Sequence, residues 1–508
     1  MLPFLALFAA CRPPLDEPVA LPVGLPTTAP GVILLAMVDG EGAVTVGGTV
    51  QAELWVDLDG PEDERYAFRY LVLDEAGEAI YARSTLGPLI VQEFLAYYSE
   101  DAGFDLLGAL PQLGQFPVLV PVLDGAASVR FEARGDDGVY KEVGRYDLGD
   151  VEADDQGLSD VVSGAETLHD AGDSRNRLDI VLMGDGYTAD EQALWRSDAE
   201  LLAQRILGTE PLASFADRIN IHRVDAVSAE SGVSYDCTDT CGMRDTAYGS
   251  VFAIEVANAL LGTDYRSSAI FQLDQWGVAR AAATFPWDMV VIVANTTHTG
   301  GFAVHYATVP KGSSDWTSTG VHELGHTLGL LGDEYESDAC IRSDALGLPE
   351  NVTDAPSAPP WAAWIDAETP LPTPDDGGWE EKVGAFEGAW NCPSLYRPAH
   401  SCKMRGSSYD AFCPVCAELL ARRLFRYSDP AAAVTVGAGA YVLEDLFPGA
   451  RTEWWVDGVL AAEDVETFTP DAVPAGSSGE VEVRVSATTP FVRVDGGDLS
   501  ETWRFDVR

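Results

Sequence analysis

The stretch that decides the fold is Val-His-Glu-Leu-Gly-His-Thr-Leu-Gly-Leu-Leu-Gly-Asp-Glu-Tyr, residues 321–335. His322 and His326 are four positions apart, so on a helix both imidazoles leave the same face and can share one metal ion. Glu323 adjoins the first histidine, where its carboxylate can reach a water molecule on that metal. The pattern therefore predicts a catalytic zinc held by both histidines, with Glu323 as the general base that accepts the proton of the water.

Upstream of this helix, strand and helix patterns alternate along the chain. A buried apolar strand leads into a turn and then into a helix, which Thr188 caps with Glu191 three residues later. This βαβ order predicts a sheet covered by helices. The expected elements are strands at 178–183, 219–226 and 288–294, a helix at 188–206 and an edge strand at 301–308.

Three segments resemble the IgA metallopeptidase family of metzincin-like zinc peptidases. They are His-Glu-Leu-Gly-His with the following Gly-Asp-Glu-Tyr at 322–335, the strand and turn at 179–188, and Cys-Lys-Met-Arg at 402–405 with Phe-Cys-Pro-Val-Cys at 412–416. The resemblance covers about residues 175–425 and implies peptidase activity, though not that IgA is the substrate. It also implies that Met404 is the Met-turn, an apolar floor beneath the zinc histidines.

A catalytic zinc needs a third protein ligand and an open position for water. In metzincins a glycine three residues after the second histidine allows a sharp turn that returns the chain to the metal, and Gly329 has that place here. The next expected ligand position is Gly332, which has no side chain to offer. We predict Asp333 as the third ligand, because it needs the smallest change of register. Glu334 is the alternative, and the acid that does not bind zinc is expected to orient a histidine.

Seven of the eight cysteines lie between residues 237 and 416. Cys237 and Cys241 are expected to close a small loop by a disulfide. Two interpretations of the other five stay open. Their thiolates could hold a second, structural zinc, or they could form disulfides that brace the Met-turn. Because seven is odd, at least one thiol is free or bound to metal. The five residues are Cys340, Cys392, Cys402, Cys413 and Cys416.

The expected edge strand supplies candidates for the substrate cleft. In related folds an extended substrate pairs with such a strand by β-augmentation. Gly300, Gly301 and His305 lie on or beside it and are therefore candidate cleft residues.

Short β-patterns separated by turn residues occur on both sides of the predicted catalytic region. The predicted fold class is α+β and multidomain, with a metzincin-like zinc peptidase domain between an N-terminal β-sandwich and a C-terminal immunoglobulin-like β-sandwich. The predicted boundaries are a signal segment at 1–11, a Pro-rich tether at 12–30, the N-terminal sandwich at 31–150, a linker at 151–175, the peptidase domain at 176–428 and the C-terminal domain at 432–508.

The charge balance restricts the partners of this chain. Its 31 Lys and Arg face 81 Asp and Glu, a formal net charge of −50. So negative a surface repels phosphate backbones, which excludes nucleic acid as a general partner. The N-terminal segment resembles a bacterial lipoprotein signal that ends at Cys11, the residue that would carry the lipid. We expect an exported monomer, at the cell surface, in the periplasm or secreted, that meets a membrane only through such an anchor.

The predicted function is a zinc-dependent endopeptidase that hydrolyses peptide bonds of extracellular proteins. One alternative is an adhesion or binding lipoprotein on a catalytically retired scaffold, against which the intact His322, Glu323 and His326 argue. A second alternative is a zinc amidase that acts on cell-wall peptides, because the same zinc chemistry serves both reactions.

Overall fold

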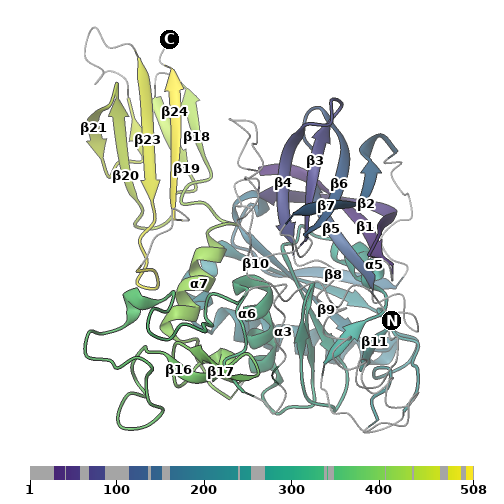
Figure 1. Cartoon of the computed structure of the whole chain (residues 1–508). Coiled ribbons are helices and arrows are strands. Elements are labelled where there is room, and N and C mark those ends of the chain that lie inside the picture. The colour runs from purple at the N-terminus through teal and green to yellow at the C-terminus, as the bar shows by residue number, and fades with distance from the viewer. Residues whose placement is uncertain are drawn as a thin grey trace.

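The structure is a computed structural model of the chain (Figure 1). It describes residues 28–39, 42–57, 68–85, 114–134, 139–150, 161–237, 241–252, 269–336, 340, 348–406, 408–437, 440–469, 479–493 and 499–506. Cys11 and most of the predicted tether lie outside the described residues. None of the helices in the described part combines the length and apolar character that a membrane span requires.

A six-stranded sheet forms the centre of the molecule, with the order β14-β15-β13-β9-β10-β8. The four inner strands are parallel, whereas β14 and β8 pair antiparallel to their neighbours at the two edges. The parallel centre agrees with the βαβ order of the sequence. The strands are β8 (Val162–His169), β9 (Leu178–Asp185), β10 (Ile219–Ala226), β13 (Met289–Ala294), β14 (Phe302–Ala303) and β15 (Ala307–Pro310).

Different elements cover the two faces of this sheet, because alternate residues of a strand point to opposite sides. Ile180 and Leu182 of β9 share a core with helices α3, α6 and α7. Val181 and Met183 pack instead with α5 and with a strand of the N-terminal region, β1. The sheet is therefore covered on both faces, and its central strands β9 and β13 are buried and mainly apolar. The helices are α3 (Gln192–Leu207), α5 (Gln275–Ala282), α6 (Trp316–Gly329) and α7 (Pro414–Leu424).

Helix α3 begins as predicted. A capping box joins Thr188 and Glu191, in which Glu191 Oε2 accepts hydrogen bonds from the backbone N–H of Thr188 at 2.9 Å and from its hydroxyl at 2.8 Å. A short 3₁₀ turn, Ala189–Glu191, precedes the first α-helical residue. The local signal placed this helix correctly because both partners lie within one turn.

Two stretches differ from the sequence prediction. Residues 162–169, which the sequence pattern places in a linker, form strand β8 along β10. Most side chains of this edge strand are at least partly exposed, so it lacks the apolar pattern of a buried strand. The stretch 301–308 is not one edge strand, because the chain turns back after Ala303 and Ala307 begins the inner strand β15.

The N-terminal region contains two antiparallel sheets, β2-β1-β5 and β4-β3-β6-β7. Leu34 and Phe116 of the first sheet share a hydrophobic core with Tyr70 and Phe131 of the second. The outer face of the first sheet covers α5, and the indole N–H of Trp276 donates a hydrogen bond to the carbonyl of Ala36 at 3.2 Å. The strands are β1 (Thr28–Val38), β2 (Val44–Asp57), β3 (Phe68–Asp74), β4 (Ala79–Thr85), β5 (Gln115–Pro121), β6 (Ala126–Arg134) and β7 (Tyr140–Asp147).

The C-terminal strands also form two antiparallel sheets, β18-β19-β22 and β21-β20-β23-β24, and stand beyond α7 (Figure 1). Their inner faces share one core, in which Trp454 stacks on Phe468 with ring centroids 5.2 Å apart. The strands are β18 (Ala433–Gly437), β19 (Ala440–Glu444), β20 (Arg451–Val456), β21 (Val459–Glu463), β22 (Thr467–Phe468), β23 (Glu480–Ser486) and β24 (Ser500–Asp506). Two hairpins of the central region complete the described strands, β11 (Ser250–Phe252) with β12 (Ile270–Gln272) and β16 (Phe386–Ala389) with β17 (Cys392–Arg397).

Asp445 joins the C-terminal strands to the central region. Its carboxylate accepts hydrogen bonds from Arg177 Nη2 at 3.0 Å and Asn176 Nδ2 at 2.9 Å, and Arg218 Nη1 lies 3.3 Å from it. Burial raises the pKa of this carboxyl, but the hydrogen bonds from Arg177 and Asn176 and the charge of Arg218 outweigh burial and lower the pKa. The ionised form therefore stabilises the contact.

We expect Asp445→Asn to lower the free energy of unfolding at neutral pH by about 1–2 kcal/mol, since a charged hydrogen-bond acceptor becomes neutral and the site is partly exposed. A lowered pKa in the folded state contributes stability above the unfolded-state pKa, and this is lost as pH falls through the folded-state value. The difference from wild type should therefore disappear in acid. Urea unfolding at neutral and acidic pH measures it.

Asp464→Asn is the matched control for this change. Both aspartates have a left-handed backbone, with φ of 50° at Asp445 and 53° at Asp464, and asparagine tolerates that conformation. The Asp464 side chain is 63% exposed, and its ion pair with Arg451 is 4.0 Å long. Equal stability of both variants and wild type at neutral pH would contradict the role of Asp445.

Candidate active site

The two histidines of α6 face one point. Their Nε2 atoms lie 3.2 Å apart and their ring centroids 4.8 Å apart. Gly325, between them in sequence, lies against Met404, where an added Cβ would come within 2.8 Å of the Met404 sulfur. The wholly buried Met404 thus packs directly on the helix that carries the histidines, in the position expected for a Met-turn.

Backbone carbonyls orient both imidazoles. Nδ1 of His322 lies 2.8 Å from the carbonyl oxygen of Lys403, and Nδ1 of His326 lies 2.6 Å from that of Leu331. Since a carbonyl oxygen can only accept, each Nδ1 carries the hydrogen. In the neutral form each Nε2 then presents a lone pair toward the shared point, as a metal ligand requires.

Asp333 completes the group. Its Oδ1 lies 3.1 Å from Nε2 of His322 and 3.3 Å from Nε2 of His326, while the hydroxyl of Tyr335 donates to its Oδ2 at 2.9 Å. Oδ1 is buried and accepts no conventional hydrogen bond from the described residues. Three atoms with lone pairs therefore converge, two nitrogens and one oxygen, which is a donor set that suits Zn²⁺.

The electrostatics of this group also favour a cation. Burial alone lowers the pKa of His326, but the adjacent Asp333 carboxylate outweighs it and raises the pKa to about 9. Burial raises the pKa of Asp333, and the two histidines outweigh it in the opposite direction, so this pKa is strongly lowered. The site thus stabilises positive charge beside an ionised carboxylate.

The turn that leads to Asp333 differs from the prediction. Leu330, with φ of 51°, adopts the left-handed conformation at the end of α6, whereas Gly329 is still helical. Gly329 serves close packing instead, because an added Cβ would lie 2.8 Å from Leu331 Cγ and 2.9 Å from Leu420 Cδ2. The chain then returns to the histidines through Leu331, whose backbone N–H donates to Gly325 at 3.3 Å.

Glu323 lies beside the edge of the sheet. The residue is 6% exposed, and a Cβ added to Gly301 would meet its Oε1 at 2.0 Å. Burial raises the pKa of this carboxyl, and Asp333 adds to the effect while the two histidines oppose it. The structure thus brings Gly301 next to Glu323, at the edge where β14 begins.

Gly300 and His305 are placed differently. Gly300 precedes Gly301 with φ of 136°, a conformation that favours glycine. His305 lies in the turn between β14 and β15, and its ring stacks on Phe116 of β5 with centroids 6.0 Å apart. Burial lowers its pKa to about 4. His305 therefore packs against the N-terminal sheet and does not join His322, His326 and Asp333.

The cysteines divide into two groups. Cys237 pairs with Cys241, as predicted, and Cys340 pairs with Cys392. The other three cysteines in the described part of the chain, Cys402, Cys413 and Cys416, are free and buried. The structure therefore shows disulfides for part of the set and leaves the thiols near Met404 unpaired.

Sequence reasoning missed the role of Lys403. Its carbonyl orients His322, while its buried ammonium group donates to the hydroxyl of Ser318 on the same helix at 2.6 Å. Burial lowers the pKa of this amine to about 8. The position next to Met404 was the only available signal, since a lysine in sequence normally indicates an exposed side chain.

Asp185 holds the turn after β9 in place through its hydrogen bonds. Its buried carboxylate accepts hydrogen bonds from the backbone N–H groups of Gly186, Tyr248 and Ser250 at 3.0, 3.1 and 2.8 Å. The hydroxyl of Thr246 donates to it at 3.1 Å. This carboxylate fixes residues 246–250 to the end of the central strand.

We expect Gly301→Ala to lower kcat by about 100-fold, because the new methyl group would displace the Glu323 carboxylate by the order of 1 Å. Steady-state kinetics on an unfolded protein substrate measures the change. Gly242→Ala is the control, since an added Cβ there has no neighbour within 4 Å. Wild-type kinetics for Gly301→Ala would show that Glu323 can move aside without cost.

A comparison with known families finds that the central part of this chain is similar to a family of metallopeptidases. The matching model is that of IgA Peptidase M64, and it covers residues 167–381. This match confirms the resemblance found in the sequence. The matched residues include both histidines, Glu323 and Asp333. Met404 and the three free cysteines lie beyond the matched residues. Among curated proteins, none matches the chain.

Proposed function

We propose that this chain is a zinc-dependent endopeptidase of extracellular proteins. The observation that carries the proposal is the convergence of His322, His326 and Asp333, whose ligand atoms all lie within 4.8 Å of one another. Three protein ligands leave the fourth position of a tetrahedral zinc open, which is typical of catalytic sites. Zinc held there would supply a Lewis acid that polarises a carbonyl group and lowers the pKa of water.

The residues of the chain provide the remaining chemistry. Glu323 follows His322 on α6 and lies beside Gly301. Its carboxylate accepts the proton of the attacking water and delivers that proton to the leaving amine. Burial, which raises the pKa of Glu323, makes the carboxylate a stronger base for this transfer.

Strand β14 is the proposed binding site of the substrate backbone. It is the last strand of the six-stranded sheet within the described residues, and it begins directly after Gly301. An extended peptide that pairs with this edge would pass Glu323 in a fixed orientation. Recognition through the backbone suits cleavage inside a chain rather than at its end.

Metal removal tests the proposal. Cleavage of an unfolded protein substrate should be lost on treatment with a chelator and should return on addition of Zn²⁺, because zinc release removes the Lewis acid. Absent cleavage with and without added zinc would instead favour the adhesion protein. Faster hydrolysis of peptidoglycan fragments than of unfolded protein would favour the cell-wall amidase.

We also propose that the protein is exported and that its flanking sheets are β-sandwich domains, the C-terminal one immunoglobulin-like. The two disulfides support an oxidising compartment. The shared cores of the paired sheets support sandwiches. Fractionation of cells that express wild type or Cys11→Ser tests whether a lipid on Cys11 retains the protein at the membrane.

A further inference from the structure

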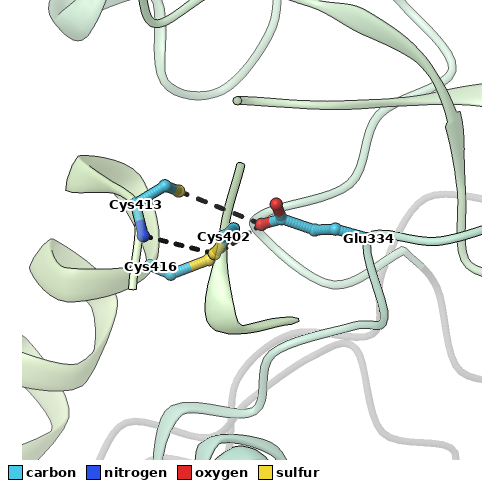
Figure 2. A group of neighbouring side chains, drawn as sticks. All are labelled: Glu334, Cys402, Cys413 and Cys416. Carbon is cyan, nitrogen blue, oxygen red and sulfur yellow. Dashed lines mark hydrogen bonds between the residues drawn. The ribbon is translucent and has the colours of Figure 1, made fainter. Parts of the chain in front are cut away.

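Four buried side chains converge between the turn after α6 and the start of α7 (Figure 2). They are Glu334, Cys402, Cys413 and Cys416, and one ligand atom of each lies within 4.8 Å of all the others. Three segments contribute them, namely the residue after Asp333, the residue before the Lys403–Arg405 turn and the first turn of α7. The group is separate from the three residues that converge at the histidines, though it begins one residue away from them.

Protein groups alone do not satisfy this cluster. Oε1 of Glu334 accepts hydrogen bonds from the thiol of Cys416 at 2.9 Å and from Asn351 Nδ2 at 3.1 Å. Oε2 is buried and has no hydrogen-bond partner among the described residues, although Glu334 is 0% exposed. A carboxyl group so placed costs free energy unless a further partner compensates it.

A disulfide would not supply that partner. The cluster has three thiols, so any one disulfide within it leaves a third thiol beside an uncompensated carboxyl group. The same chain forms its disulfides elsewhere, at Cys237–Cys241 and Cys340–Cys392. A cation bound by all four side chains would satisfy the three sulfurs and the carboxylate together.

The local backbone suits metal-bound thiolates. Cys413 caps the N-terminus of α7, Pro414 follows at the first helical position, and Cys416 lies in the first turn, which gives the Cys-x-x-Cys spacing of zinc sites. The backbone N–H of Cys413 donates to the sulfur of Cys402 at 3.2 Å. Hydrogen bonds of this kind and the positive end of a helix both stabilise thiolates.

The distances fit a small divalent ion. Tetrahedral zinc with zinc–sulfur bonds of about 2.3 Å separates its ligand atoms by about 3.7 Å. Oε1 of Glu334 lies 4.0 Å from the sulfur of Cys413 and 2.9 Å from that of Cys416, on either side of this value. Three sulfurs and one oxygen select a thiophilic metal over Mg²⁺ or Ca²⁺.

We propose that Glu334, Cys402, Cys413 and Cys416 form a second metal site, structural in function, that binds Zn²⁺ with no open position. Its ligands adjoin the catalytic group at two places. Glu334 follows Asp333 and donates its backbone N–H to the carbonyl of Met404 at 2.8 Å, and Cys402 precedes Lys403, whose carbonyl orients His322. The second metal would thereby fix the positions of Asp333 and His322.

Metal content and cobalt spectroscopy of the full-length protein test the proposal. Wild type should bind two zinc ions per chain, and its Co²⁺ form should show thiolate-to-cobalt charge-transfer absorption in the near ultraviolet. His326→Ala should bind one metal and retain that absorption, whereas Cys413→Ser should bind one metal and lose the absorption. The absorption thus reports the cysteine site whether or not the histidine site is active. Failure of the proposed second metal site is therefore distinguishable from failure of the proposed peptidase activity.

Thiol alkylation of wild type keeps the test independent of variants that fail to fold. After denaturation in chelator without reductant, the three cysteines of the cluster should all be alkylated, and zinc should protect them in the native protein. Alkylation of only one of the three would reveal a disulfide and overturn the proposal. Alkylation of all three cluster cysteines in a protein that binds one metal and shows no charge-transfer absorption would overturn it as well.

Discussion

Replacement of Glu323 by glutamine should lower kcat by about 10²–10⁴-fold, the range that a positioned general base contributes. The amide is nearly isosteric with the carboxylate, so packing beside Gly301 is preserved, but it cannot accept a proton from water. His322, His326 and Asp333 remain, so the catalytic metal should stay bound. Kinetics on an unfolded protein substrate, with metal analysis of the same sample, separates these two effects.

Glu387→Gln provides the matched control, because this glutamate of β16 is exposed on the same domain. It should leave both kcat and metal content at wild-type values. Near-normal turnover of Glu323→Gln with its metal bound would mean that another group accepts the proton. Loss of metal from this variant would mean that Glu323 acts as a ligand, and the assigned division of roles would be wrong.

The parts of the fold that the sequence predicted correctly depend on local patterns. The spacing of His322 and His326 sets a helix face, and Thr188 with Glu191 marks a helix start, because in both cases the partners lie within one turn. The apolar run of β9 likewise indicated a strand buried on both faces. Such local patterns can be interpreted correctly without knowledge of the tertiary structure.

Edges and turns were harder to predict because their form depends on distant residues. Strand β8 exists through its pairing with β10, and its own residues carry no apolar run. The reversal between β14 and β15 places His305 against Phe116, almost two hundred positions earlier in the chain. Likewise, the pairing of Cys340 with Cys392 is one of several that the sequence allowed.

The two acids after Gly332 show how tertiary pairing resolves a local ambiguity. The carbonyl of Asp333 accepts from the backbone N–H of Trp390 at 2.7 Å, and that of Tyr335 accepts from Asn391 at 3.0 Å. The segment is thus paired like a short strand, in which neighbouring side chains point to opposite sides. Asp333 faces the histidines and Glu334 faces the cysteines. Both acids are candidates in the sequence, and the pairing with residues 390–391 places Asp333 rather than Glu334 beside the histidines.

Replacement of Asp333 by asparagine should therefore weaken binding of the catalytic zinc by at least about 100-fold, since even residues outside the ligand shell contribute about 10–100-fold. The amide keeps the size of the side chain but removes the charge that attracts the cation and that raises the pKa of His326. The free zinc concentration that gives half-maximal activity should rise by the same factor. At saturating zinc the activity should be partly recovered.

Glu334→Gln is the comparison that makes this prediction specific, because it makes the same chemical change one residue further along. Its Oε1 contacts Cys416 and Asn351 rather than the catalytic histidines, so its activity should respond to zinc within about 10-fold of wild type. The opposite order of effects, with Glu334→Gln more impaired in the zinc response than Asp333→Asn, would assign the third catalytic ligand to Glu334. Since both variants replace a carboxyl group by an amide at neighbouring positions, a difference between them reports which side of the paired segment each carboxyl group faces.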